Sequence, residues 1–170
     1  MENKTSVITM IKKLNLATFT ISSVLLLFMA LSVSADAVLR YVFNSPSTWV
    51  NEISGYLLVV MTFLAIGHTL LLGGHVRMDM LYHKVSPKKQ IILYCISYVL
   101  VFIYASVFFY YALNMTLASF SMGWKSSTIL AIPFYLPQMF MPIGLLLLIL
   151  ETIVLFYEKI MEYKKISSVE

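Results

Sequence analysis

The sequence predicts an all-α membrane protein with about four transmembrane helices, and two observations predict it. First, 60% of the 170 residues are hydrophobic and only 12% are charged, whereas a soluble domain carries about 25% charged residues. Second, formal charges are absent from the long stretches 14–35, 53–74, 90–124 and 126–150. A soluble fold of this size has no interior that could hold so much apolar side chain.

These stretches divide into four spans of one membrane domain, 1–170. A helix needs about 20 apolar residues to cross the hydrocarbon core, so the interval 90–150 is too long for one span and holds two. Long unbroken runs favour helices over barrel strands, which show short alternating segments. The expected spans are about 14–35, 50–72, 91–113 and 133–156.

The start of the fourth span has two alternatives, because Pro133, Pro137 and Pro142 lie within it. Proline removes a helical hydrogen bond and clashes with the preceding turn. Either the helix begins near Ile129 and is kinked, or 129–135 is a separate interfacial piece. The second alternative, which we favour, extends the helix to about Phe156 and takes Glu151 to the inner edge of the membrane.

Positive charges predict the orientation of the spans. Of the twelve Lys and Arg residues, only Arg40 and Lys125 fall on one side, and the other ten fall on the opposite side. The positive-inside rule makes the side with ten cytoplasmic, which places both termini there. The residues before the first span, 1–13, are expected to form a short polar lead. A cleaved signal peptide is the rival interpretation, but 22 uncharged residues exceed the length of its usual apolar segment.

Three charged residues gather at the outer end of the first two spans. Asp36 and Arg40 are four residues apart and share a helix face, and Glu52 opens the second span on the same side. An ion or substrate site is one interpretation. We favour a structural ion-pair cluster, because these charges lie at span ends rather than at mid-depth.

The histidines allow further alternatives. His68 lies in the inner third of the second span and could relay protons, but a hydrogen bond to a neighbouring helix is the better interpretation. His75, Asp79 and His83 have a spacing that would suit a divalent metal on a helix. A helix lying on the membrane surface explains that segment better, so no metal or other cofactor is expected.

Nothing in the sequence resembles a catalytic set, and the chain is not expected to be an enzyme. The HExxH zinc motif, the GxSxG nucleophile elbow and phosphate-binding glycine loops are all absent. The net charge of +4 is scattered at span ends, so nucleic acid is not an expected partner. Only His68 lies inside a span, which argues against a haem-bearing anchor.

Several motifs around the second span together resemble a known family. They are Arg40-Tyr41-Val42-Phe43-Asn44, Trp49-Val50-Asn51-Glu52 and Gly74-His75-Val76-Arg77-Met78-Asp79. The later Gly123-Trp124-Lys125-Ser126-Ser127 and the proline-bearing last span also fit. The pattern, over about 14–156, is similar to that of the small membrane subunit of tripartite ATP-independent periplasmic (TRAP) transporters. Asn51 is a departure, because many relatives carry two adjacent acidic residues there.

The resemblance implies a function and partners. A large multispan permease subunit would hold the substrate and sodium sites, and a periplasmic solute-binding protein would deliver an organic acid, such as a C4-dicarboxylate or a sugar acid. The small subunit would lie in the bacterial inner membrane, among lipids, and scaffold the large one. Arg40, Asn44, Trp49 and Glu52 would shape the outer end, and His75, Arg77 and Asp79 would fix the inner end of the second span. The alternative is a free-standing membrane anchor or assembly protein.

Overall fold

The structure is a computed structural model that describes residues 2–72 and 87–167. Four of its helices are long and apolar enough to cross a membrane, and the candidate spans within them are Ile8–Val42, Val50–Leu71, Lys89–Ser121 and Tyr135–Lys164. The described residues form no strand beyond an isolated bridge between Lys125 and Pro133. The predicted all-α membrane class is therefore confirmed. The helices are α1 (Glu2–Val42), α2 (Val50–Leu71), α4 (Pro87–Ser121), α5 (Tyr135–Gln138) and α6 (Phe140–Ser167).

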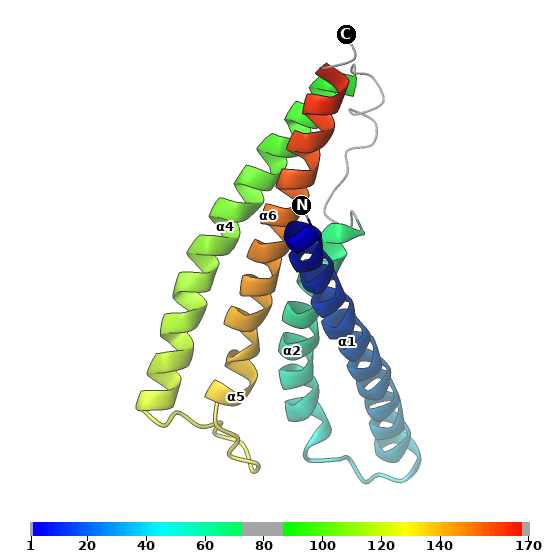
Figure 1. Cartoon of the computed structure of the whole chain (residues 1–170). Coiled ribbons are helices and arrows are strands. Elements are labelled where there is room, and N and C mark those ends of the chain that lie inside the picture. Colours follow the sequence, from blue (N-terminus) through cyan, green and yellow to red (C-terminus); the bar gives the residue numbers. More distant parts are fainter. Residues whose placement is uncertain (1, 73–86, 168–170) are drawn as a thin grey trace.

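The long helices lie in a row in the order α4, α6, α2, α1 (Figure 1). α6 packs against both α4 and α2, and α1 packs mainly on α2. Burial agrees with this order. In the most apolar 18-residue stretch of each span, 44% of the residues are buried in the last span, but only 11% in α4 and 6% in α1. The two flanking helices therefore each offer one packed face and leave the rest of their surface for lipid or protein.

Small residues permit close contact at the centre of the row. Ala105 and Ala112 of α4 are buried against Leu145 and Leu148 of α6. On the other side of α6, a Cβ atom added to Gly144 would lie 2.0 Å from the backbone oxygen of Phe63 in α2. In lipid, helices associate through such packing because the hydrocarbon removes the usual hydrophobic drive.

α1 is one continuous helix, so the polar lead and the first span belong to the same helix. Its end is set by Asn44, which has a left-handed φ of 51°. Asparagine tolerates that conformation better than most residues. The turn allows the backbone N–H of Ser45 to donate to the carbonyl of Leu39 at 3.1 Å, which accounts for one carbonyl at the helix end.

The helix of the fourth span does not begin near Ile129, which excludes the first of the two alternatives. Residues 122–134 lie outside the helices, α5 forms one short turn of helix, and α6 then runs to Ser167. Pro137 lies within the short α5 and Pro142 lies in the first turn of α6. Proline is tolerated in the first turn because the N–H groups there have no helical acceptor.

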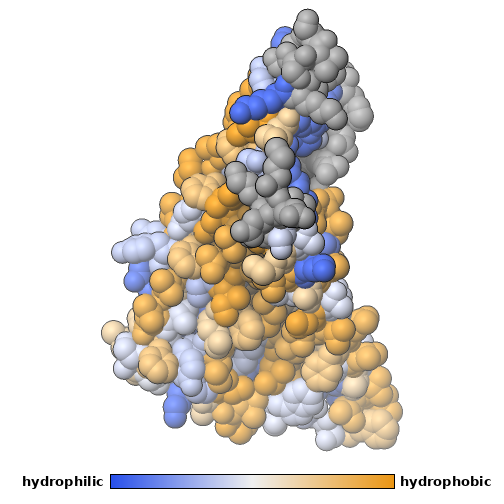
Figure 2. Space-filling view, in the orientation of Figure 1, coloured by the Kyte–Doolittle hydropathy of each residue, from blue (hydrophilic) through white to orange (hydrophobic). Residues whose placement is uncertain are grey.

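Apolar side chains cover most of the exposed surface. Figure 2 shows hydrophobic residues over much of the visible face, with hydrophilic residues scattered between them. On the flanks, Leu27 and Leu31 of α1 are 66% and 72% exposed, and Leu100 and Tyr110 of α4 are 62% and 63% exposed. Such surface is stable only against lipid or another membrane protein.

Candidate functional site

Polar contacts between elements occur at two levels of the bundle. We call the level that includes Asp36, Glu52 and Thr128 the loop end, because the loops after α1 and α4 lie there. We call the level that includes Lys12 and Glu158 the terminal end, because those residues belong to the first and last parts of the described chain.

At the loop end, Asp36 and Arg40 form the ion pair that their spacing predicts. Arg40 Nη2 lies 2.7 Å from Asp36 Oδ2, and the aspartate side chain is only 5% exposed. Its other oxygen, Oδ1, accepts the backbone N–H of Ser47 at 2.7 Å. Asp36 thus connects the last turns of α1 to the loop that leads into α2. An almost buried carboxylate needs such partners.

Glu52 does not join that pair. Its Oε1 accepts the Tyr56 hydroxyl at 2.8 Å, one turn further along α2. Its Oε2 accepts the Thr128 hydroxyl from the loop between α4 and α5. The expected three-residue cluster is therefore absent from these residues, and two separate groups of contacts take its place. Asp36 connects α1 to the loop that follows it, and Glu52 connects α2 to the loop before α5.

The remaining sequence-predicted residues lie as follows. Asn44 ends α1, as described above, and is exposed. Trp49 immediately precedes α2, is 41% exposed and accepts the backbone N–H of Ile53 at 3.0 Å through its carbonyl. Both therefore lie at the loop end near Arg40 and Glu52 in the chain. His75, Arg77 and Asp79 lie outside the described residues, as does the rest of the segment proposed to lie on the membrane.

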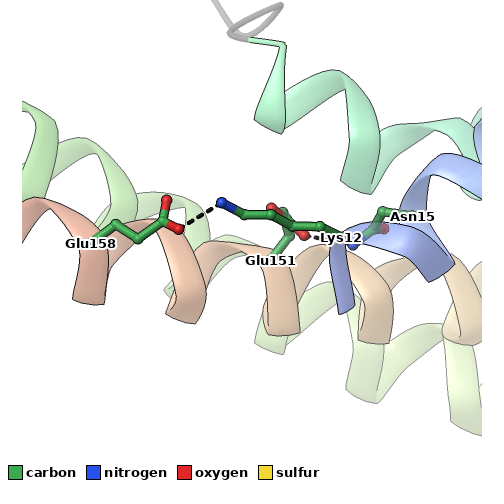
Figure 3. A network of polar contacts seen from close by, with 4 residues as sticks. All are labelled: Lys12, Asn15, Glu151 and Glu158. Carbon is green, nitrogen blue, oxygen red and sulfur yellow. Dashed lines mark hydrogen bonds and ion pairs between the residues drawn. The ribbon is translucent and has the colours of Figure 1, made fainter. Parts of the chain in front are cut away.

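At the terminal end, a hydrogen bond crosses between α1 and α6. Asn15 Nδ2 donates to Glu151 Oε2 at 2.7 Å (Figure 3), and both side chains are 0% exposed. The other polar atom of each group, the amide oxygen Asn15 Oδ1 and the carboxylate oxygen Glu151 Oε1, is buried without a hydrogen-bond partner. A carboxyl group buried in an apolar bundle is costly unless it is hydrogen-bonded, so this contact matters to how the two helices pack.

A second contact continues the same interface toward the ends of the helices. Lys12 Nζ lies 2.6 Å from Glu158 Oε1 (Figure 3), with side chains 32% and 41% exposed. Lys12 and Asn15 are three residues apart on α1, and Glu151 and Glu158 are two turns apart on α6. The interface thus passes from a buried hydrogen bond to a half-exposed ion pair.

α2 meets this interface at Gly67. A Cβ atom added there would lie 2.1 Å from Asn15 Oδ1, so glycine leaves the room that the asparagine occupies. The next residue, His68, is buried and packs its ring on Phe19 of α1, with 4.8 Å between centroids. Its Nδ1 has no hydrogen-bond partner, and the contact with α1 that the described residues show is this ring contact.

Sequence reasoning placed Glu151 at the membrane edge but missed Lys12, Asn15 and Glu158 as partners. The available signal was weak: an amide and three charged residues at the borders of apolar stretches. Among the residues that the structure describes, no group of three or more His, Cys, Asp or Glu side chains could hold a metal ion. The polar contacts at the loop end and at the terminal end connect helices and loops to one another.

A comparison with known protein families identifies the family of this sequence. Residues 29–162 match the family model of tripartite ATP-independent periplasmic transporters, DctQ component, which covers more than half of the chain. No curated protein matched the sequence. The matched region takes in α2, α4, most of α6 and the loop-end residues Arg40, Asn44, Trp49 and Glu52. The family is one of transporter components rather than of enzymes, and its place is the inner membrane. The chain belongs to the DctQ family and is the small membrane component of a TRAP transporter.

Proposed function

We propose that the chain scaffolds the large permease subunit of a sodium-driven importer that takes an organic acid from a periplasmic solute-binding protein. Family membership supports the transporter and its three-part composition. The sodium gradient and the organic acid are supported by the resemblance of the motifs, and the scaffold role is supported by the arrangement of the helices. The terminal end is proposed to face the cytoplasm, with the loop end facing the periplasm.

The observation that carries the scaffold role is the helix row with its uncovered flanks. α1 and α4 lie at the two ends of the row, and only 6% and 11% of the residues in their most apolar stretches are buried. The Asn15–Glu151 hydrogen bond, which lies within the apolar stretches, joins two of the chain's own helices. Transport of a polar solute needs polar sites near the midplane, so a large partner that supplies them accounts for both features.

The loop-end residues are proposed to shape the surface that faces the partner proteins. Arg40 is 44% exposed although it is paired to Asp36, and Trp49, which immediately precedes α2, is 41% exposed. A half-exposed guanidinium and an indole at the membrane interface are groups that protein interfaces favour. His75, Arg77 and Asp79 are proposed, from the motif alone, to fix the inner end of the second span.

Reconstitution tests the proposal. Vesicles that contain the large subunit and this chain, supplied with the binding protein, should accumulate the organic acid when a sodium gradient is imposed. Omission of this chain should abolish uptake and lower the thermal stability of the large subunit. Unchanged uptake and stability without it would refute the scaffold role.

Single variants test the residue assignments. Arg40→Ala and Asp79→Ala should reduce uptake, and co-purification with the large subunit should fall for whichever residue contacts it. Lys125→Ala is the matched control, because Lys125 is another exposed cation among the loop-end residues. Wild-type uptake and co-purification in both test variants would remove these residues from the interface.

A further inference from the structure

A continuous apolar groove runs between α4 and α6 toward the terminal end. Its larger part has a volume of about 560 Å³, and its smaller part, of about 230 Å³, shares Val99 and Phe156 with it. The wall residues are apolar apart from Cys95, Thr152, the tyrosines and one lysine at the mouth. The larger part is lined by Ile91, Ile92, Cys95, Ile96, Val99, Leu100, Phe156, Ile160, Tyr163 and Lys164.

The groove has the length of one lipid leaflet. Along α4 its lining runs from Ile91 to Phe102, which corresponds to about 17 Å at the helical rise of 1.5 Å per residue. Half of the hydrocarbon core measures about 15 Å. The groove begins two residues beyond Lys89, where the candidate span of α4 starts, and it ends near the middle of the helix. A spanning helix of a partner would need a surface that continues through both leaflets.

Positive charge marks the mouth of the groove. Lys164 lines it directly, and its side chain is exposed. Lys89, exposed on the first turns of α4, lies at the same end. Lys159 is engaged there by the Glu162 carboxylate at 2.6 Å and lies 5.1 Å from the centre of the Tyr94 ring. A phosphate at this position would meet a cation at the depth where lipid headgroups lie.

We propose that this groove binds one acyl chain of an anionic phospholipid from the leaflet on the side of the termini, with the lipid phosphate held by Lys164. The match has three parts: an apolar wall, a length of one leaflet and a cation at the interfacial end. The site is formed by this chain alone and goes beyond the scaffold role. The two are compatible, because a bound lipid would cover part of the exposed flank of α4.

Native mass spectrometry of the purified full chain tests the headgroup preference. Phosphatidylglycerol and phosphatidylethanolamine with identical acyl chains are offered in equal amounts. One lysine near a lipid surface supports a preference of about fivefold for the anionic lipid. Lys164→Ala should bring the two lipids close to parity, whereas Lys125→Ala, which removes the same charge at the loop end, should leave the preference unchanged.

A second variant fills the groove. Val99→Trp should reduce the retention of both lipids, because Val99 lines both parts of the groove. Leu117→Trp is the matched control at another exposed position on α4. Circular dichroism and gel filtration verify that each variant folds, which both should do because the substituted side chains are 45% and 56% exposed.

Photo-crosslinking locates the lipid in the assembled transporter. Phosphatidylglycerol with a diazirine on its acyl chain should form adducts within residues 91–102 and 152–164 of this chain. Equal retention of both lipids by the wild type, retention unchanged by Val99→Trp, or adducts only outside these segments would each overturn the proposal. Loss of the adducts on assembly with the large subunit would also overturn it, because a protein helix would then occupy the groove.

Discussion

Asn15 and Glu151 are hydrogen-bonded at 2.7 Å although 136 positions separate them in the sequence. The contact joins the first and the last long helices, between two side chains with no exposed surface. α1 otherwise packs mainly on α2, so this bond gives α1 a specific partner on α6. Polar contacts in apolar surroundings specify which helix faces meet, because the wrong pairing leaves both groups without partners.

Removal of the carboxylate should destabilise the bundle. In Glu151→Ala the buried amide of Asn15 loses its acceptor, and we expect a loss of about 1–3 kcal/mol in the free energy of unfolding. Glu151→Gln keeps a carbonyl acceptor at the same place and should lose less. Unfolding in detergent, followed by circular dichroism, measures both. Glu162→Ala is the control, because its half-exposed ion pair with Lys159 is worth less than about 1 kcal/mol. Equal effects of Glu151→Ala and Glu162→Ala would contradict the prediction.

Gly67→Ala should destabilise the protein through Asn15. The new methyl group would lie 2.1 Å from Asn15 Oδ1, and the asparagine could move away only by giving up its bond to Glu151. Overpacking of this kind costs about 1–3 kcal/mol. In an Asn15→Ala background the same substitution should cost much less, which a double-mutant cycle detects. Gly55→Ala, with nothing within 4 Å of the added Cβ, is the control on the same helix. Additive effects of Gly67→Ala and Asn15→Ala would show that the two sites are independent.

Gly144→Ala should be more damaging and should resist rescue by a side-chain change. The added Cβ would lie 2.0 Å from the backbone oxygen of Phe63, so α2 and α6 would have to separate. We expect a loss of about 3 kcal/mol, at the upper end of the range for overpacking. Shortening the neighbouring side chain with Phe63→Ala should not restore stability, because the obstacle is a carbonyl. A melting temperature equal to that of Gly55→Ala would disprove the close approach of the two helices.

Labelling from outside the cell should identify which end faces the periplasm. Cys95 is the only cysteine, so a Cys95→Ala background allows single cysteines to be introduced. Lys125→Cys should react with a membrane-impermeant maleimide in intact spheroplasts. Lys13→Cys, at the terminal end, should react only after permeabilisation. The reverse pattern would invert the orientation that the positive charges predict.

The sequence predicted those features that depend on local spacing. Four apolar stretches predicted four membrane-spanning helices, and the i,i+4 spacing of Asp36 and Arg40 predicted their ion pair. Both follow from the geometry of a single helix. The family resemblance also came from the sequence, because its motifs are short and lie near one another.

Contacts between distant segments were not predictable in the same way. Glu52 was expected beside Asp36 because both lie at the same membrane level, but its partner Thr128 comes from a loop 76 positions away. The Asn15–Glu151 bond likewise depends on which face of α1 reaches α6. Such pairings follow from the order of the helices in the row, and a hydrophobic pattern without a polar face says little about that order.

The bond between the first and last helices also constrains biogenesis. Asn15 enters the bilayer early in translation, while its acceptor on α6 has not yet been made. Glu151 lies 136 positions after Asn15, so at about 5–20 residues per second the interval lasts about 7–27 s. During that interval the nascent first helix carries an amide whose mature partner does not exist, so the insertion machinery or neighbouring lipids must accommodate it until α6 has been synthesised.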